Sequence, residues 1–128
     1  MRIAEFFAVS GLFIAASFAA PASAAPVAAE LRVCAACHSF GAGEPNRLGP
    51  NLNGFCARPV GKAEGFAYSA GFKASTVKWN AASLDSFLEN PRQAMPGTRM
   101  AAAPIGDPAK RVATIAALTE ATGCKTLK

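Results

Sequence analysis

The chain has 128 residues and a formal net charge of +5, because its 13 Lys and Arg outnumber its 8 Asp and Glu. That length suits a single domain. The excess of positive charge favours acidic partners. Nucleic acid is a poor candidate, because the basic residues are spread singly along the chain and are not clustered with aromatic residues.

The first 24 residues have the features of a secretory signal peptide and are expected to be removed. Arg2 makes the start basic, residues 6–20 are apolar or small, and Ala22–Ala24 offers small side chains to a signal peptidase. A retained membrane anchor is the alternative, but the apolar run is shorter than the roughly 20 residues that a membrane-spanning helix needs. The sequence therefore predicts one exported domain, residues 25–128, in the periplasm without a stable membrane anchor.

A first helix is expected between residues 27 and 40, where Val27, Leu31 and Cys34 recur at helical spacing. Residues 41–71 then contain seven glycines and three prolines, a composition that ends helices and favours turns. A loop of this length is unusual in a compact domain unless it wraps around something. A large cofactor is therefore expected.

A short amphipathic helix is expected from Ser83 onwards. Its apolar stripe consists of Leu84, Phe87 and Leu88. The helix must end by Asn90, because Pro91 disfavours a helical residue before it. A second loop follows.

A final helix is predicted to begin with Asp107 as N-cap and Pro108 at the first helical position, and to end near Gly123. Its expected buried stripe consists of Val112, Ile115, Ala116 and Thr119. No segment alternates apolar and polar residues for long enough to predict a strand. The fold class is therefore all-α with long loops.

The Cys34-Ala35-Ala36-Cys37-His38 segment has the spacing of c-type haem attachment, in which two thiols add to the haem vinyl groups and the histidine binds the iron. On a helix, positions i, i+3 and i+4 share one face, so these three groups can meet one side of a flat macrocycle. A thioredoxin-like redox pair, a structural disulfide and half of a zinc site are alternatives. The redox pair lacks an α/β context, and zinc would need ligands beyond the one histidine and two distant cysteines.

Further blocks follow this motif in a fixed order. They are GPNLNG from Gly49, GFAYS from Gly65, Trp79, LENP from Leu88, and PGTRM from Pro96 to Met100. With this series the mature chain resembles the class I cytochrome c family, especially cytochromes c2 and mitochondrial cytochrome c. The resemblance implies a fold of three to five helices and long loops wrapped around one covalently bound haem c, with crossing terminal helices and one exposed haem edge.

The sixth iron ligand must come from a distant residue, and Met95 and Met100 are the methionines outside the signal peptide. Both lie in a proline-rich loop, so composition leaves the choice open. The resemblance implies Met100, the last residue of the PGTRM block, and leaves Met95 as a packing residue. His38 and Met100 are thus the expected iron ligands, and such a pair raises the haem potential.

The resemblance also implies several residues around the haem. The carbonyl of Pro50 is expected to accept a hydrogen bond from the second nitrogen of the axial His38, which orients the ring. The residues expected to hydrogen-bond or neutralise the haem propionates are Arg58, Tyr68, Trp79 and Thr98. Without such partners two buried carboxylates would be costly.

The chain departs from the family pattern at a few positions. Phe87 stands where relatives often carry a tyrosine near the methionine sulfur, and Ala102 stands where many carry an aromatic residue. Pro26, Glu30 and Ala117 occupy positions where the terminal helices of relatives often pack a glycine and aromatic residues. None of these departures removes an iron ligand.

Cys56 and Cys124 lack the spacing for haem attachment. Because the chain is expected to be exported and the cysteines left after haem attachment are even in number, these two are predicted to form a disulfide. Two free thiols are the alternative.

Six bonds to the iron leave no open coordination position, so the chain is not expected to be an enzyme. The resemblance implies a monohaem carrier that shuttles single electrons between redox complexes such as a bc1 complex, an oxidase, a reaction centre or a dehydrogenase. The basic residues placed around the haem edge by the resemblance are Arg32, Arg47, Arg92 and Arg99. They would steer acidic redox partners toward a monomeric carrier. A dedicated haem c subunit of one periplasmic dehydrogenase or reductase is the alternative, and a peroxidase-like haem enzyme is a more distant one.

Overall fold

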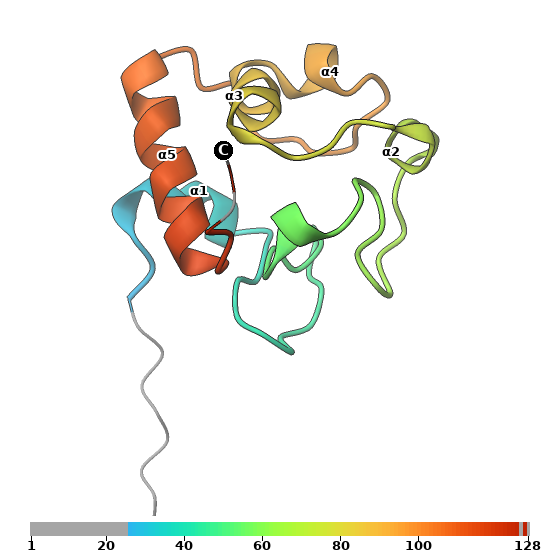
Figure 1. The fold of residues 1–128 in the computed structure, drawn as a ribbon, viewed down its shortest axis with the longest axis horizontal. Coiled ribbons are helices and arrows are strands. Elements are labelled where there is room, and N and C mark those ends of the chain that lie inside the picture. Colours follow the sequence, from blue (N-terminus) through green and yellow to red (C-terminus); the bar gives the residue numbers. More distant parts are fainter. Residues whose placement is uncertain (1–25, 126, 128) are drawn as a thin grey trace, which may run out of the picture.

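The computed structural model describes residues 26–125 and 127, and within them every regular element is helical (Figure 1). The elements in order are η1 (Ala29–Leu31), α1 (Arg32–Ala35), η2 (Phe55–Ala57), α2 (Ala70–Ala74), α3 (Ala81–Glu89), α4 (Pro91–Ala94) and α5 (Pro108–Ala121). The expected all-α class is confirmed. The proposed signal peptide, residues 1–24, and the proposed mature start lie outside the described residues. Among the described helices, none combines the length and the apolar character needed to cross a bilayer.

The first helix is shorter than predicted. A 3-10 turn, η1, leads into the single turn of α1, and the Cys34 carbonyl then accepts from both the Cys37 N–H at 3.0 Å and the His38 N–H at 2.9 Å. Leu31 is fully buried, but Val33 is 73% exposed. The helical spacing of apolar residues therefore predicted a larger buried face than the structure has, because Leu31 is the only residue of η1 and α1 in the buried core.

Helix α3 follows the prediction from its apolar stripe, and Leu84, Phe87 and Leu88 are its buried residues. Asn80 caps the start, since its side chain accepts from the Ser83 N–H while the Ser83 hydroxyl accepts from the Asn80 N–H. The helix ends before Asn90, as the following proline requires. Asn90 also caps the short α4, which starts at Pro91.

The start of α5 is confirmed, because the Asp107 side chain accepts from the N–H groups of Ala109 and Lys110 and Pro108 is the first helical residue. The predicted stripe is only partly right, since Ile115 and Thr119 are partly buried and Ile115 packs against the apolar core. The residues of α5 that are buried are Arg111, Thr114 and Leu118, whereas Val112 is 66% exposed and Ala116 is exposed. The buried face overlaps the face that hydropathy selected at Ile115 but is rotated toward Arg111.

Arg111 explains this rotation, because its guanidinium is satisfied inside the fold. Its Nε donates to the Asp85 carboxylate at 2.8 Å, and a second nitrogen lies 3.5 Å from the Glu89 carboxylate. A third nitrogen donates to the Ile105 carbonyl at 2.9 Å and the Gly106 carbonyl at 3.1 Å. A buried cation with this many partners is tolerated. Arg111 therefore fixes α5 against α3 and the preceding loop.

Two apolar clusters form the core. The larger contains Leu31, Phe55, Leu84, Leu88, Leu118 and Cys124, and the smaller contains Val60, Phe87 and Met95. Trp79 packs against both clusters. Helix α5 packs on η1, so the crossing of the terminal segments that the resemblance implied is present (Figure 1). The departures at Glu30 and Ala117 do not prevent it.

The long loop is largely irregular, as predicted, with η2 as its one regular turn before α2 begins at Ala70. The loop is tied to the end of the chain by a disulfide between Cys56 and Cys124, whose Cα atoms are 5.7 Å apart. In addition, the Gly54 N–H donates to the Thr122 carbonyl at 2.8 Å. The predicted disulfide is therefore present in the structure.

We expect reduction of the Cys56–Cys124 disulfide to lower the free energy of unfolding by about 4 kcal/mol or somewhat less, because the bond closes a loop across 68 positions and limits the unfolded chain. The measurement is urea unfolding with and without reductant, repeated on the Cys56→Ser/Cys124→Ser variant, which should no longer respond to reductant. Two titratable thiols from Cys56 and Cys124 in the unfolded, unreduced protein would contradict this expectation.

Candidate haem-binding site

The side chain of His38 is oriented by a contact behind it. Its Nδ1 lies 2.8 Å from the carbonyl oxygen of Pro50, as the resemblance implied. A carbonyl oxygen can only accept, so Nδ1 carries the proton and Nε2 keeps its lone pair. Burial lowers the pKa of His38, the charge of Arg47 lowers it further, and the hydrogen bond to Pro50 opposes both. The imidazole is therefore held neutral, in the tautomer that binds a metal through Nε2.

Gly49 lies directly against the His38 ring. A Cβ atom at this position would lie 2.3 Å from His38 Cε1 and 2.6 Å from Nδ1. The Gly49 N–H also donates to the Cys37 carbonyl at 2.8 Å. The loop is thus bonded both to the backbone of Cys37 and to the ring of His38, and only a glycine fits against the ring at this position.

Cys34 and Cys37 are both partly buried thiols in the structure and are not joined to each other. Burial is the main reason why the pKa of Cys34 is raised, and the neighbouring Cys37 raises it further. The structural-disulfide alternative for this pair is therefore not what the structure shows. Both thiols are available for covalent attachment, Cys34 about one helical turn before His38 and Cys37 directly before it.

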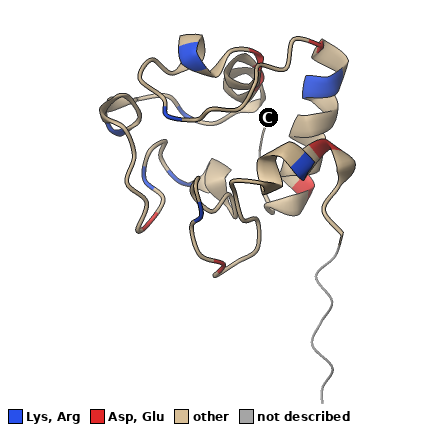
Figure 2. Ribbon diagram, turned by 180° about the vertical axis from the view of Figure 1, so that it is seen from behind, with Lys and Arg blue, Asp and Glu red and all other residues tan. Residues whose placement is uncertain are grey.

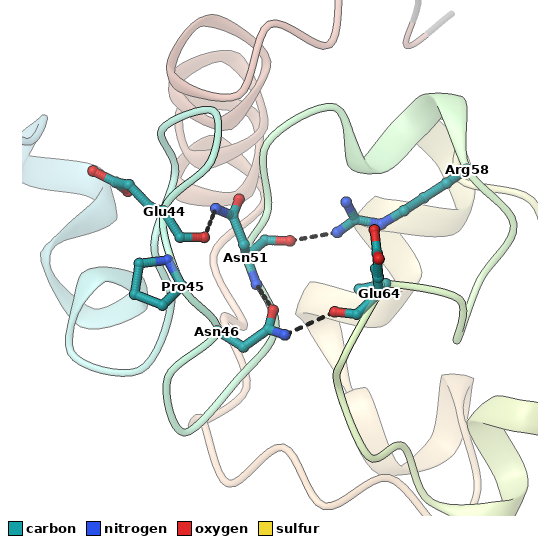
Figure 3. Close-up of a pocket in the computed structure, with 7 residues that line it drawn as sticks. Glu44, Pro45, Asn46, Asn51, Arg58 and Glu64 are labelled. Atoms are coloured by element: carbon teal, nitrogen blue, oxygen red, sulfur yellow. Dashed lines mark hydrogen bonds between the residues drawn. The ribbon is translucent and has the colours of Figure 1, made fainter.

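Arg58 lies against the loop that carries Pro50. Its guanidinium donates to the carbonyl of Asn53 at 3.0 Å and to the carbonyl of Asn51. It also lines a cavity of about 280 Å³ together with Asn46 and Glu64 (Figure 3). The structure therefore gives Arg58 a structural role in this loop, and a contact with a haem propionate is an additional role that stays a prediction.

Tyr68 and Trp79 both lie in aromatic surroundings. The Tyr68 ring stacks on Phe72 with centroids 5.5 Å apart, and burial is the main cause that raises its pKa. Trp79 meets Phe55 and Phe87 edge to face, at centroid distances of 6.3 and 5.3 Å. Phe87, the departure from the family tyrosine, is therefore buried among aromatic rings.

The two methionines differ clearly in their surroundings. Met95 is 4% exposed and belongs to the smaller core cluster, whereas Met100 is partly buried and packs against the edge of that cluster. The Thr98 hydroxyl accepts from the Met100 N–H at 3.2 Å, so Thr98 shapes the backbone that presents Met100.

These residues fit a covalently bound haem. Two free thiols three positions apart precede an imidazole whose Nε2 is left without a proton, and a thioether lies in a separate loop. This donor set matches the covalent and axial chemistry of haem c. The fold and the site together define an all-helical c-type haem protein.

Comparison with known proteins gives the family. The chain is 48% identical over 68 residues to a cytochrome c of Stellaria longipes, a match that spans 53% of this chain and 63% of that protein. It is 40% identical over 105 residues to a cytochrome c2 of Blastochloris viridis, spanning 80% of this chain and 83% of that protein. The structure is similar to cytochrome cH from Methylobacterium extorquens, with a TM-score of 0.66 and 37% identity over 71% of this chain and 91% of that chain. No protein-family model matches the chain.

The chain belongs to the class I c-type cytochrome family. It therefore binds one covalent haem c with iron, and it is an electron carrier and not an enzyme. The sequence predicted the attachment motif, but it did not predict that Gly49 contacts the His38 ring or that Asn46 belongs to the neighbouring loop network. The asparagine-rich composition of the loop was the signal that could have suggested such a network.

We expect Gly49→Ala to displace the His38 ring and break its hydrogen bond to Pro50, because the new methyl group would overlap the imidazole. Overpacking of this kind costs about 1–3 kcal/mol of stability. The measurement is nuclear magnetic resonance of the His38 ring together with denaturant unfolding. Gly106→Ala is the control, since a Cβ at Gly106 meets nothing within 4 Å. Equal behaviour of the two variants would refute the steric argument.

Proposed function

We propose that Cys34 and Cys37 form the thioether bonds to the haem, and that His38 and Met100 are its axial iron ligands. The observation that carries this assignment is the hydrogen bond from His38 Nδ1 to Pro50, because it directs the unprotonated Nε2 to serve as the ligand. When bound, the haem supplies an iron that alternates between ferrous and ferric states. The protein's own residues hold that group and orient its ligands.

The surroundings of the two methionines support Met100 over Met95. Met95 is enclosed by the apolar cluster with Val60 and Phe87, where its thioether fills core volume. Met100 follows a turn in which the Thr98 N–H donates to the Met95 carbonyl at 3.0 Å, with Gly97 at a φ of 78°. That turn separates Met95, which is buried, from Met100, which is only partly buried and whose thioether is proposed to bind the iron.

The remaining haem-binding residues are proposed from the family resemblance and are consistent with their positions. Pro50 holds the axial histidine. Arg58, Tyr68, Trp79 and Thr98 are proposed to surround the haem and its propionates. Burial raises the pKa of Tyr68, and the positive charge of Arg58 opposes that rise, which supports a common polar edge to the site.

We propose further that the protein is a monomeric, diffusible carrier of the periplasm that exchanges single electrons with acidic redox partners. All four arginines proposed around the haem edge, Arg32, Arg47, Arg92 and Arg99, are exposed. Lys and Arg positions, coloured blue in Figure 2, are spread over several segments of the chain. Sedimentation of the purified native protein as a single small species would support the free carrier, whereas stable co-purification with a dehydrogenase would favour a dedicated subunit.

Met100→Ala is expected to abolish the methionine-to-iron absorption band and to lower the reduction potential sharply, because the thioether ligand is lost. Met95→Ala is expected to keep both properties while lowering the free energy of unfolding by about 2–5 kcal/mol, since it empties a core position. Spectrophotometric redox titration of both holoproteins measures the contrast. Loss of the band in Met95→Ala alone would reverse the ligand assignment.

The electrostatic part of the proposal predicts how charge affects the reaction with small redox reagents. Arg32→Glu/Arg92→Glu should slow oxidation of the ferrous protein by ferricyanide about tenfold at low salt, because the variant repels an anion near the haem edge. Stopped-flow kinetics measure the rate. The effect should shrink at high salt and reverse in sign with a cationic cobalt oxidant.

A matched control separates local from total charge. Lys110→Glu makes the same kind of charge reversal at an exposed position on α5. The double variant Lys110→Glu/Lys125→Glu reverses two exposed charges that do not belong to the four arginines. It changes the net charge as much as Arg32→Glu/Arg92→Glu does. If both double variants slow ferricyanide equally, the four arginines do not mark the site of electron exchange.

A further inference from the structure

The side chain of Asn46 connects two parts of the long loop (Figure 3). Its Nδ2 donates to the Glu64 carbonyl at 2.8 Å, and its Oδ1 accepts from the Asn51 N–H at 2.8 Å. The first bond reaches a residue 18 positions later in the chain, and the second reaches the residue directly after Pro50. One side-chain amide makes both bonds, because its NH2 group donates and its oxygen accepts.

The Asn51 N–H belongs to the same peptide unit as the Pro50 carbonyl. No peptide bond in the described residues is cis, so this planar unit is trans and its C=O and N–H point in opposite directions. His38 donates to the oxygen at one side, and Asn46 accepts from the N–H at the other. The peptide unit is thereby held between the side chain of Asn46 and the ring of His38.

This arrangement has an electronic as well as a geometric consequence. Hydrogen bonds in a chain polarise one another. The hydrogen bond from the Asn51 N–H to Asn46 therefore makes the Pro50 carbonyl a stronger acceptor. A stronger acceptor makes the imidazole of His38 a more basic ligand. Asn46 is the side chain that binds the N–H of this peptide unit directly.

Asn51 adds to the rigidity of the same unit. Its own Nδ2 donates to the carbonyls of Gly41 and Glu44 at 2.8 and 2.7 Å, and its carbonyl accepts from Arg58 (Figure 3). The backbone that follows Pro50 is thus fixed from several directions. Asn46 differs from these contacts because it binds the peptide unit that His38 itself uses.

We propose that Asn46 is a positioning residue for the axial ligand, acting through the Pro50–Asn51 peptide on the orientation and basicity of His38. The proposal rests on the proposed ligation by His38. It assigns Asn46 two separable tasks: the Oδ1 atom holds the peptide behind His38, and the Nδ2 atom ties the loop to Glu64.

Two substitutions separate these tasks. Asn46→Leu removes both atoms with little change in shape, whereas Asn46→Asp keeps an oxygen toward the Asn51 N–H and loses the donor toward Glu64. Both variants should therefore be less stable than the native protein. Only Asn46→Leu should disturb His38, and Asn46→Asp should restore the ligand as a conservative replacement.

The main readout is exchange of the His38 Nδ1 proton with solvent, followed by nuclear magnetic resonance on the ferrous holoprotein. In Asn46→Leu the exchange should be about tenfold faster, which corresponds to about 1.4 kcal/mol of weaker protection. In Asn46→Asp it should stay within about threefold of the native rate. The reduction potential should rise in Asn46→Leu, because a less basic imidazole stabilises ferric iron less well.

A stability control excludes a general loosening of the fold. Asn80→Ala removes the N-cap of α3, far along the chain from His38, and should lower stability without accelerating exchange at His38. If Asn46→Leu and Asn46→Asp accelerate exchange alike, or if Asn46→Leu behaves like Asn80→Ala, Asn46 is only a tether and the proposal is overturned. Asn46→Ala replaces Asn46→Leu in the same comparison if the leucine variant gives no folded holoprotein.

The native holoprotein tests separately whether His38 is the axial ligand. If His38 is not the axial ligand, the native holoprotein itself will lack the paramagnetically shifted ring signals of a bound imidazole in its ferric state. If the native signals are present and the variants match the control, the ligand assignment stands and only the role of Asn46 fails.

Discussion

The arrangement of the site depends on the hydrogen bond between His38 Nδ1 and the Pro50 carbonyl. This bond sets the tautomer of the ring, and it joins the segment that follows α1 to a loop that has almost no regular structure of its own. Gly49 completes the junction, since its N–H reaches Cys37 while its missing side chain leaves room for the ring. The proposed iron ligand His38 is thus oriented by backbone groups that a single loop supplies.

The helical frame is held by different forces. Leu31 and Leu118 bring η1 and α5 together in the larger cluster, the Cys56–Cys124 disulfide ties the loop to the end of α5, and Arg111 connects α5 to α3. These contacts are apolar, covalent and ionic, whereas the loop around Pro50 is organised by amide and carbonyl hydrogen bonds. Stability of the frame and orientation of the ligand therefore rest on separate sets of residues.

The elements that the sequence predicted well are those with local signals. Asn90 followed by Pro91 ends α3, and Asp107 followed by Pro108 starts α5, because caps and prolines act within one helical turn. The buried face of α5 could not be predicted in this way. Hydropathy ranks Val112 above Arg111, but tertiary partners satisfy the guanidinium and leave the valine in solvent.

The same distinction applies to the site. Cys34, Cys37 and His38 are recognisable because haem attachment demands a fixed local spacing, and the family resemblance was needed to associate Pro50 with His38 across 12 positions. Asn46 lies in an irregular loop and bonds to the carbonyl of Glu64, so no periodicity marks it. A metal ligand has a chemistry that limits its residue type, whereas any residue with a suitable amide can orient a backbone carbonyl. Motifs therefore predict which side chains bind the iron, whereas only the three-dimensional path of the loop reveals what orients them.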